Sequence, residues 1–270
     1  MSKLEEGANF KYRPIAGYSV LDGRPETVAD ALISEMNKGA RFTVAFFNSR
    51  LVVKLKELRR DASRYANFLF LNDGVAASAA SVVSNGQFLR HNLNGTDFTP
   101  LLLSRLPRGT RVFLYGGKVD VVRQAAEVIA ERTEVDVVGY MDGYTYRDAA
   151  VAQQISHSRP DVVLVALGNP LQEDWMADHG PATGARLVLG VGALFDFLSE
   201  TVSRAPKWVR AARLEWAYRL LLEPRRMLRR YTLDSLYFFW LVLRMKGRTQ
   251  TVGLKHIGTA PVAQGFDAAA

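Results

Sequence analysis

Two strand-then-helix units between residues 160 and 196 constrain the fold of this chain more than any other feature. Each unit begins with a continuous apolar run, Val162–Leu167 in the first and Leu187–Val191 in the second. Such runs are typical of parallel strands that are covered on both faces. The first ends in a Gly-Asn-Pro turn at residues 168–170 and the second at Gly192. Ligands usually bind at the carboxyl edge of such a sheet. The alternative is that the glycines at these turns only allow the chain to turn tightly.

The same alternation continues along the rest of the chain. Apolar runs predict strands at residues 15–20, 42–47, 68–71, 111–115 and 135–139, and helical spacing predicts helices starting near residues 27, 51, 94, 118 and 148. The helix after residue 47 is expected to bury Leu51, Leu55 and Leu58. Residues 1–12 resemble a loose arm, and the stretch from 74 to 93 lacks a clear period.

These elements predict an α/β fold, with a mostly parallel sheet, helices on both faces (Rossmann-like) and a C-terminal helical appendage. The expected boundaries are an α/β core at residues 13–205 and a basic amphipathic helical appendage at 206–247. The last stretch, residues 248–270, is rich in Gly, Ala and Gln without periodicity, so we expect a disordered tail there.

The composition excludes several kinds of site. The chain has no cysteine, which excludes disulfides and Cys-based zinc sites. Its four histidines show no ligand spacing and no Asp-x-Asp occurs, so no metal site is predicted. No apolar run of about 18 residues is present, and the first residues lack a signal pattern. We therefore expect a cytoplasmic protein without a membrane-spanning helix.

The positive charge of the chain is concentrated near its C-terminal end. The formal net charge is +8, and residues 207–231 hold eight Lys or Arg and two Glu, a local charge of +6. A basic patch beside apolar residues indicates a phosphate-bearing partner: a nucleic acid, an anionic lipid or a diphosphate substrate.

Two alternative functions depend on single features. The Gly190–Phe195 turn is the basis for one alternative function, a nucleotide-dependent oxidoreductase or epimerase. The match is weak, because Phe195 occupies the position where the dinucleotide-binding motif has its third Gly. The basic patch is the basis for the other alternative, a non-enzymatic nucleic-acid-binding or scaffold protein. Its aromatic residues fall at a helical spacing typical of core or membrane contact, which disfavours nucleic acid as a partner.

Polar or Gly-rich turns follow nearly every predicted strand. They contain Asn48, Asp73, Gly116-Gly117, Gly143-Tyr144, Gln172-Glu173 and Gly192–Asp196. Because the carboxyl ends of parallel strands meet at one edge of a sheet, these turns are expected to converge on one crevice. This convergence favours a functional site over turns that serve the fold alone.

A series of motifs occurs in order along residues 15–231. They are Asn72–Gly74, Asn94–Asp97, Leu114–Lys118, Gly143-Tyr144, Leu167–Trp175, Gly190–Asp196, Arg204–Trp208, Leu214–Leu220, Glu223–Arg226 and Arg229–Tyr231. In this set the chain resembles the WecG/TagA/CpsF family of bacterial glycosyltransferases.

The resemblance implies an inverting, metal-independent glycosyltransferase that needs no cofactor. Such an enzyme moves a sugar from a UDP-sugar to a polyprenyl-diphosphate-linked sugar acceptor in exopolysaccharide, capsule or cell-envelope polysaccharide biosynthesis. The resemblance also implies a peripheral location on the inner face of the cytoplasmic membrane, with a C-terminal appendage that docks on the membrane and helps complete the site.

Roles for individual residues are implied by the same resemblance. Asp73 matches the proposed general base, Asn48 matches a polar residue of its pocket, and Gln172 matches a residue expected to contact the donor or the acceptor. An Asp that caps its own turn is the alternative for Asp73. Tyr144 and Asp196 are expected beside the UDP. The implied substrate-binding residues are Asn94, Gly95, Asp97, Gly116, Gly117, Lys118, Tyr144, Glu173, Gly192, Phe195, Asp196, Arg204, Arg226 and Arg229, of which Arg226 or Arg229 would neutralise the diphosphate.

Two positions depart from the family pattern. Many members have Arg-Val-Thr-Gly where this chain has Asn92-Leu-Asn-Gly95, and many have Thr where this chain has Phe46. These departures leave the role of that rim, and the sugar that it selects, open.

Residues 232–246 predict an interfacial helix. Leu236, Trp240 and Leu243 recur at i, i+4 and i+7, and the apolar run is too short to span a bilayer. Flanking basic residues make the stretch typical of a helix that lies on an anionic membrane surface: Arg229, Arg230, Arg244, Lys246 and Arg248. Packing on the core or on a second subunit is the alternative, so formation of a homo-oligomer stays open.

Overall fold

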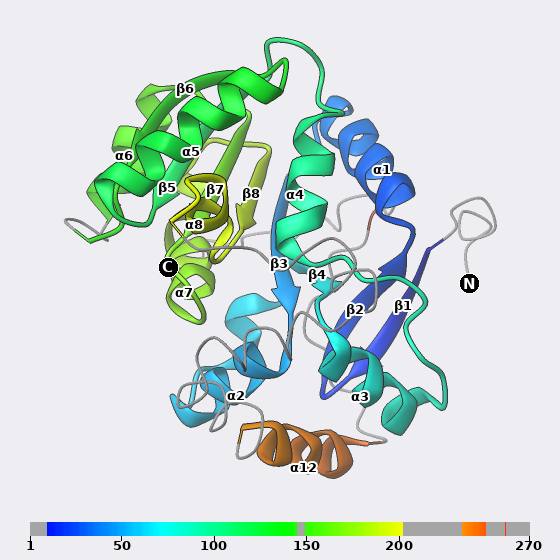
Figure 1. Ribbon diagram of the computed structural model, residues 1–270. Helices are drawn as coiled ribbons and strands as arrows, with labels where there is room; N and C mark the ends of the chain where they lie inside the picture. Colours follow the sequence, from blue (N-terminus) through cyan, green and yellow to red (C-terminus); the bar gives the residue numbers. More distant parts are fainter. Residues whose placement is uncertain (1–9, 145–148, 202–233, 247–256, 258–270) are drawn as a thin grey trace, which may run out of the picture.

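An eight-stranded, mostly parallel sheet forms the centre of the molecule (Figure 1). The computed structural model describes residues 10–144, 149–201, 234–246 and 257. The strand order is β1-β2-β4-β3-β8-β7-β5-β6, and β1 alone is antiparallel to its neighbour among the described strands. The strands are β1 (Phe10–Ile15), β2 (Tyr18–Gly23), β3 (Phe42–Phe47), β4 (Phe68–Asn72), β5 (Arg111–Gly116), β6 (Asp136–Met141), β7 (Val162–Ala166) and β8 (Leu187–Gly190).

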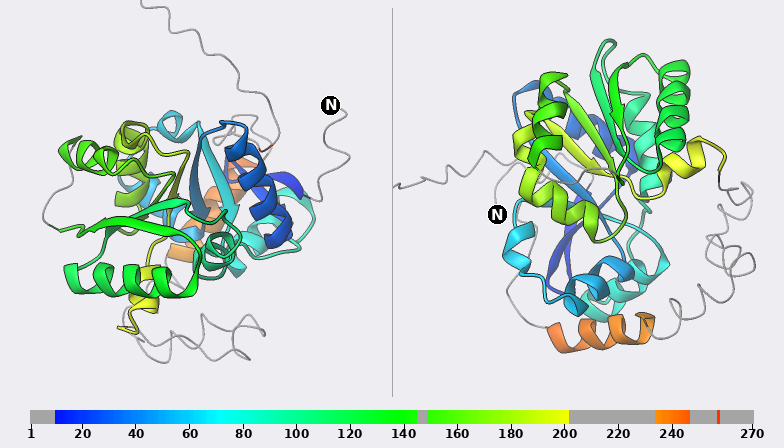
Figure 2. Two further views of the ribbon diagram at one scale, coloured as in Figure 1. Left: turned by 90° about the horizontal axis from the view of Figure 1, so that it is seen from above. Right: turned by 90° about the vertical axis from the view of Figure 1, so that its left-hand side faces the viewer.

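Helices cover both faces of this sheet, which confirms the predicted α/β class (Figures 1 and 2). One face carries α1 (Pro25–Asn37), α4 (Gly95–Leu103), α5 (Val119–Arg132) and α8 (Leu194–Leu198). The other carries α2 (Ser49–Glu57), α3 (Val75–Asn85), α6 (Ala149–His157), α7 (Leu171–His179) and α12 (Ser235–Met245), together with the short 3-10 helices η1 (Ala62–Tyr65) and η2 (Gly180–Thr183).

The strands are apolar on both sides because each contributes to two hydrophobic cores. Successive strand side chains point to opposite faces of a sheet. In β3, Val44 and Phe46 therefore belong to the core beneath α1 and α4, whereas Ala45 and Phe47 belong to the core beneath α2 and α12. This two-sided burial explains why these strands appear in the sequence as continuous apolar runs.

Three sequence expectations near the N-terminal end need correction. Residues 15–20 do not form one strand, because Ala16 and Gly17 take positive φ values of 49° and 81° and turn the chain between β1 and β2. The edge strand β1 instead begins at Phe10, inside the stretch expected to be a loose arm. Leu58 is not buried: it follows the last residue of α2 and is 50% exposed.

The stretch without a clear period contains α3, a helix that the sequence pattern does not predict. This helix is rich in Ala and Ser, so its apolar stripe is weak in the sequence. It begins directly after Gly74 and buries Ala77 and Ala80. Small side chains let it lie close to its neighbours, among them β1 and α12.

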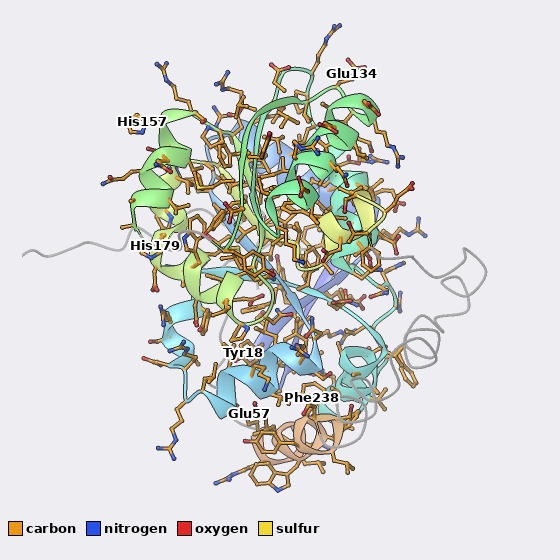
Figure 3. All side chains as sticks on the ribbon, turned by 60° about the vertical axis from the view of Figure 1, so that its left-hand side comes forward. Tyr18, Glu57, Glu134, His157, His179 and Phe238 are labelled. Atoms are coloured by element: carbon orange, nitrogen blue, oxygen red, sulfur yellow. The ribbon has the colours of Figure 1, made fainter. Side chains whose placement is uncertain are left out.

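The C-terminal helix α12 packs beneath α2 and α3. Phe238 (Figure 3), Leu241 and Val242 are its buried residues. The ring centroid of Phe238 lies 6.3 Å from that of Phe47. Packing on the core, the alternative to a purely interfacial helix, therefore accounts for one face of this helix. Most of the expected appendage, residues 206–233, and the boundary at 205 lie outside the described residues.

One residue of the expected tail is described, and it is buried. Ile257 is 7% exposed and belongs to the core beneath α1, and its backbone N–H donates to the Tyr12 hydroxyl at 2.8 Å. The rest of the stretch expected to be disordered lies outside the described residues.

Candidate active site

Asn48 and Asp73 meet at the carboxyl ends of two neighbouring strands, β3 and β4. The Asn48 side chain caps α2, since its Oδ1 accepts from the Leu51 N–H at 3.0 Å. Its Nδ2 donates to Oδ2 of Asp73 at 3.2 Å. The Asp73 N–H in turn donates to the Phe47 carbonyl at 2.9 Å, which joins the two strand ends. The capping bond fixes the Asn48 amide with its NH₂ group toward the Asp73 carboxylate.

The loop before α4 lies against this pair. The backbone carbonyl of Asn72 accepts from the Leu93 N–H at 2.9 Å. The Asn72 side-chain NH₂ group donates to the His91 carbonyl. The Gly74 N–H donates to Oδ1 of Asn92 at 3.0 Å. At the position where many family members carry Arg, this chain thus has an amide that holds the backbone of the Asp73 turn.

Three of the expected substrate-binding residues lie in the first turn of α4. Asn94 caps the helix: its Oδ1 accepts from the Asp97 N–H at 3.0 Å and its Nδ2 donates to the Asp97 carboxylate at 2.9 Å. A Cβ on Gly95 would lie 2.9 Å from the Phe46 ring, so Gly95 lets the helix start close to β3. The contacts shown for these residues shape the rim, and a substrate role for them stays a prediction.

Gln172 and Glu173 lie in the first turn of α7, where it faces the end of β8. Both are buried, at 2% and 0% exposure. Oε1 of Gln172 accepts from the Gly192 N–H at 3.0 Å, and its Nε2 donates to Oε1 of Glu173 at 2.8 Å. Nδ2 of Asn169 donates to the same Glu173 oxygen at 2.7 Å. Burial raises the pKa of Glu173 to about 7. Asn169 had no predicted role of its own, although it lies within the Leu167–Trp175 motif.

Glycines bring the turns after β5, β6 and β7 together. Gly116 has φ +123°, and a Cβ there would lie 2.4 Å from the Ala166 carbonyl oxygen. The Gly117 N–H donates to that same carbonyl at 3.0 Å, and the Gly143 N–H donates to the Gly117 carbonyl at 3.0 Å. Tyr144 lies at the rim and is 68% exposed. The turns after β5, β6 and β7 therefore meet at this edge, as the parallel sheet predicts.

The turns at 116–118 and 192–196 face one another. Burial raises the pKa of Asp196, and the nearby Lys118 ammonium opposes that rise. Phe195 is buried, and a Cβ on Gly117 would lie 3.9 Å from its ring. The Lys118 ammonium is thus near enough to act electrostatically on the Asp196 carboxyl. Their expected role beside the UDP stays a prediction, and Arg204, Arg226 and Arg229 lie outside the described residues.

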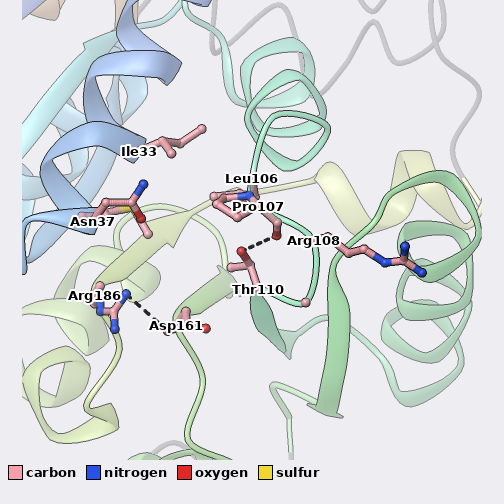
Figure 4. A pocket seen from close by; sticks show the side chains of 10 residues that line it. Ile33, Asn37, Leu106, Pro107, Arg108, Thr110, Asp161 and Arg186 are labelled. Carbon is pink, nitrogen blue, oxygen red and sulfur yellow. Dashed lines mark hydrogen bonds and ion pairs between the residues drawn. The ribbon is translucent and has the colours of Figure 1, made fainter.

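Two cavities lie at the opposite, amino edge of the sheet. One of about 320 Å³ is lined by residues that include Ile33, Leu106 and Arg186 (Figure 4), and a second of about 500 Å³ shares Asp161 and Arg186 with it. The polar contact between these two side chains is an ion pair at 3.8 Å. Neither cavity contains an expected site residue, so we place the candidate site at the carboxyl edge.

No metal centre and no membrane span appear in the described part of the chain. Residues 10–144, 149–201, 234–246 and 257 contain no group of three or more His, Asp or Glu placed to hold a metal ion. Over the same ranges, no helix is both long and apolar enough to cross a membrane.

Comparison with known protein sequences identifies the family of this chain. One relative, the N-acetylglucosaminyldiphosphoundecaprenol N-acetyl-beta-D-mannosaminyltransferase of Bacillus subtilis (strain 168), is 36% identical over 166 residues, 61% of this chain and 64% of the relative. A protein of the same name from Bacillus spizizenii (strain ATCC 23059 / NRRL B-14472 / W23) is 33% identical over 195 residues, 71% of this chain and 75% of the relative. The sequence pattern of the Glycosyl transferase WecG/TagA/CpsF family matches residues 13–251. The chain therefore belongs to the WecG/TagA/CpsF family of glycosyl transferases.

Proposed function

We propose that this protein transfers a sugar from a UDP-sugar to a sugar carried on a lipid diphosphate, in the assembly of a bacterial exopolysaccharide, capsule or other envelope polysaccharide. The family match over residues 13–251 carries the proposal. The names of two relatives support the acceptor class, because both describe transfer to N-acetylglucosaminyl-diphosphoundecaprenol. The Asn48–Asp73 pair supplies a carboxylate at the edge where α/β proteins bind ligands.

The proposed chemistry is one displacement at the anomeric carbon, with inversion. The acceptor hydroxyl attacks that carbon, Asp73 takes the hydroxyl proton, and the bond to the UDP oxygen breaks. Asn48 donates to Oδ2 of the Asp73 carboxylate and so orients the group that is proposed to take the proton. Charge grows on the leaving diphosphate, and we assign its neutralisation to Arg226 or Arg229.

The decisive experiment is a screen of UDP-sugars for acceptor-dependent release of UDP. The acceptor is N-acetylglucosamine diphosphate on a short polyprenyl chain, and UDP-N-acetylmannosamine is the first donor because of the relatives' names. We expect release with one donor class only, and only when acceptor is present. No release with any donor, together with tight NAD binding by calorimetry, would favour an oxidoreductase or epimerase instead. Nanomolar, salt-sensitive binding of DNA or RNA without transfer would favour a nucleic-acid-binding protein.

Transfer is expected to continue without a divalent metal ion. The chain has no Asp-x-Asp motif to clamp a metal on the diphosphate, so side chains and backbone N–H groups must carry that charge. We expect the rate measured in excess EDTA to stay within about twofold of the untreated rate. Full inhibition that Mg²⁺ or Mn²⁺ reverses would contradict this expectation.

We further propose that α12 attaches the protein to the inner face of the cytoplasmic membrane. Opposite its buried face, this helix exposes Leu236, Trp240 and Leu243 at 70%, 48% and 61%. Tyr237 stacks on Trp240 with ring centroids 5.7 Å apart, and the Arg244 guanidinium lies 5.1 Å from the Trp240 ring. An apolar, aromatic strip with a basic end suits an anionic lipid surface. Such attachment would bring the site to its lipid-linked acceptor.

A Trp240→Glu variant is expected to lose most of its binding to anionic liposomes while it stays folded. The substitution places a negative charge on the exposed strip and leaves the buried Phe238 face intact. Each basic residue near an anionic surface contributes about 1 kcal/mol, so wild-type protein should also come off the vesicles at high salt. The measurement is co-sedimentation with vesicles of anionic or neutral lipid.

Tyr140→Glu is the matched control for this experiment. Tyr140 is 44% exposed but lies on β6, at the sheet edge far from α12 (Figure 1). We expect this variant to sediment with anionic vesicles as wild type does. Equal binding of wild type to neutral and anionic vesicles, or no binding at all, would refute the membrane proposal.

A further inference from the structure

The Gln172 amide joins the start of α7 to the turn after β8, and its orientation depends on Glu173. An amide side chain presents an oxygen on one side and an NH₂ group on the other, and a half-turn exchanges the two. Here the oxygen accepts from the Gly192 N–H, and the NH₂ group faces Oε1 of Glu173. Oε1 of Glu173 accepts from the NH₂ groups of both Gln172 and Asn169, so a turned Gln172 amide would place its own oxygen against an oxygen that already acts as an acceptor.

From this contact we propose that Glu173 is a positioning residue, which sets the Gln172 amide so that it holds the Gly192 turn and thereby fixes the donor side of the site. The inference deepens the proposed function and rests on it. Glu173 itself has no exposed surface, so it acts through Gln172 rather than by touching a substrate.

Close packing around β8 supports the proposal that Glu173 positions the Gln172 amide. A Cβ on Gly190 would lie 2.9 Å from Nε2 of Gln172 and 2.8 Å from the Met176 methyl group. The Gln172 side chain therefore lies flat against the end of β8, in space that another residue at position 190 would fill. Asn169 donates to the same Glu173 oxygen and so holds the carboxylate from the β7 side.

The Gly192 turn leads directly into α8, the helix that carries Phe195 and Asp196. Gly192 has φ +56°, a left-handed conformation, and its N–H is held by the Gln172 oxygen. The Lys118 ammonium, from the turn after β5, acts electrostatically on the Asp196 carboxyl. A turn that loses its hydrogen-bond acceptor would let Phe195 and Asp196 shift. Misplacement of about 1 Å at a reacting centre costs about 10²-fold in rate.

Three variants test the proposal. Glu173→Met keeps the length of the side chain and removes the acceptor. Glu173→Gln keeps an oxygen that can accept from Gln172, so it is the conservative variant. Asp174→Asn is the matched control, because Asp174 is also buried on α7 and accepts from the Tyr65 hydroxyl at 2.5 Å but has no hydrogen bond to the Gln172 amide.

Two readouts separate positioning from a general loss of stability. For Glu173→Met we expect kcat/KM for the donor to fall by about 10²-fold while the acceptor KM changes less than about threefold. Hydrogen exchange of the Gly192 amide, measured without substrate, should accelerate by about tenfold or more as its acceptor is lost. Glu173→Gln should keep both within about threefold of wild type, and Asp174→Asn should lower the melting temperature without either change.

The exchange measurement keeps this inference separate from the proposed function. If wild type transfers no sugar, the proposed function fails, and Gly192 exchange still decides whether Glu173 positions the turn. Unchanged exchange in Glu173→Met, or equal effects in Glu173→Met and Asp174→Asn, would overturn the proposal. Should Glu173→Met not fold, Gln172→Met removes the amide instead and must accelerate Gly192 exchange; failure to do so would also overturn it.

Discussion

An Asp73→Asn enzyme is expected to lose about 10²–10⁴-fold of its transfer rate, the usual contribution of a general base, and to keep its fold. The amide cannot take the proton of the acceptor hydroxyl at neutral pH. It can still accept from Nδ2 of Asn48, and the backbone bond from residue 73 to the Phe47 carbonyl does not involve the side chain. The loss should therefore fall on the chemical step.

The measurement is single-turnover transfer with both substrates saturating, beside thermal unfolding and calorimetric UDP binding. We expect the melting temperature and the UDP dissociation constant to match those of wild type. A rate within about threefold of wild type would remove Asp73 from the mechanism. A lowered melting temperature with weaker UDP binding would show that Asp73 serves the turn, the alternative that its sequence context left open.

The second large expected effect is a pH dependence of the free energy of unfolding that comes from Glu173. Burial raises the pKa of this carboxyl from 4.5 to about 7. Between those values the folded protein holds a proton that the unfolded chain has released, so the free energy of unfolding falls as pH rises through this window. A shift of about 2.5 pKa units corresponds to roughly 3 kcal/mol. Glu173→Gln has no such proton, so wild type should lose roughly 3 kcal/mol relative to this variant between about pH 4 and pH 8.

Urea unfolding of both proteins at several pH values tests this expectation. The difference in unfolding free energy should be nearly constant below about pH 4.5, change through neutral pH and level off above about pH 8. A difference that does not vary with pH would show that the carboxyl titrates alike in the folded and unfolded states. A difference of opposite sign would mean that hydrogen bonds from Asn169 and Gln172 outweigh the cost of burial.

The sequence predicted most of the sheet because its parallel strands are buried on two faces. The runs at 42–47, 162–167 and 187–191 are almost entirely apolar, which helices and loops seldom are. The same criterion does not detect α3, whose Ala and Ser side chains suffice only because β1 and α12 lie close to it. Such closeness is a tertiary property that local periodicity does not contain.

The location of the candidate site at the strand ends was predictable from the sequence, but the contacts among its side chains were not. Asn48 and Asp73 each end a predicted strand, so their convergence follows from the parallel sheet. Burial of Glu173 does not follow from its own segment, because Gln172, Glu173 and Asp174 together resemble a solvated polar turn. Its environment comes from β8, where Gly190 leaves the space that Gln172 occupies.

The position of β8 also bears on how the protein is made. The strand is the last along the described chain, yet it lies between β3 and β7 in the sheet. During synthesis from the N-terminus, the two parts of the sheet, β1 to β4 and β5 to β7, can therefore be joined only after residues 187–190 leave the ribosome. Until then β3 and β7 are unpaired edges, and unpaired edges promote aggregation. Asn48 and Asn169 follow these two strands, so the candidate site cannot assemble until its central strand has been translated.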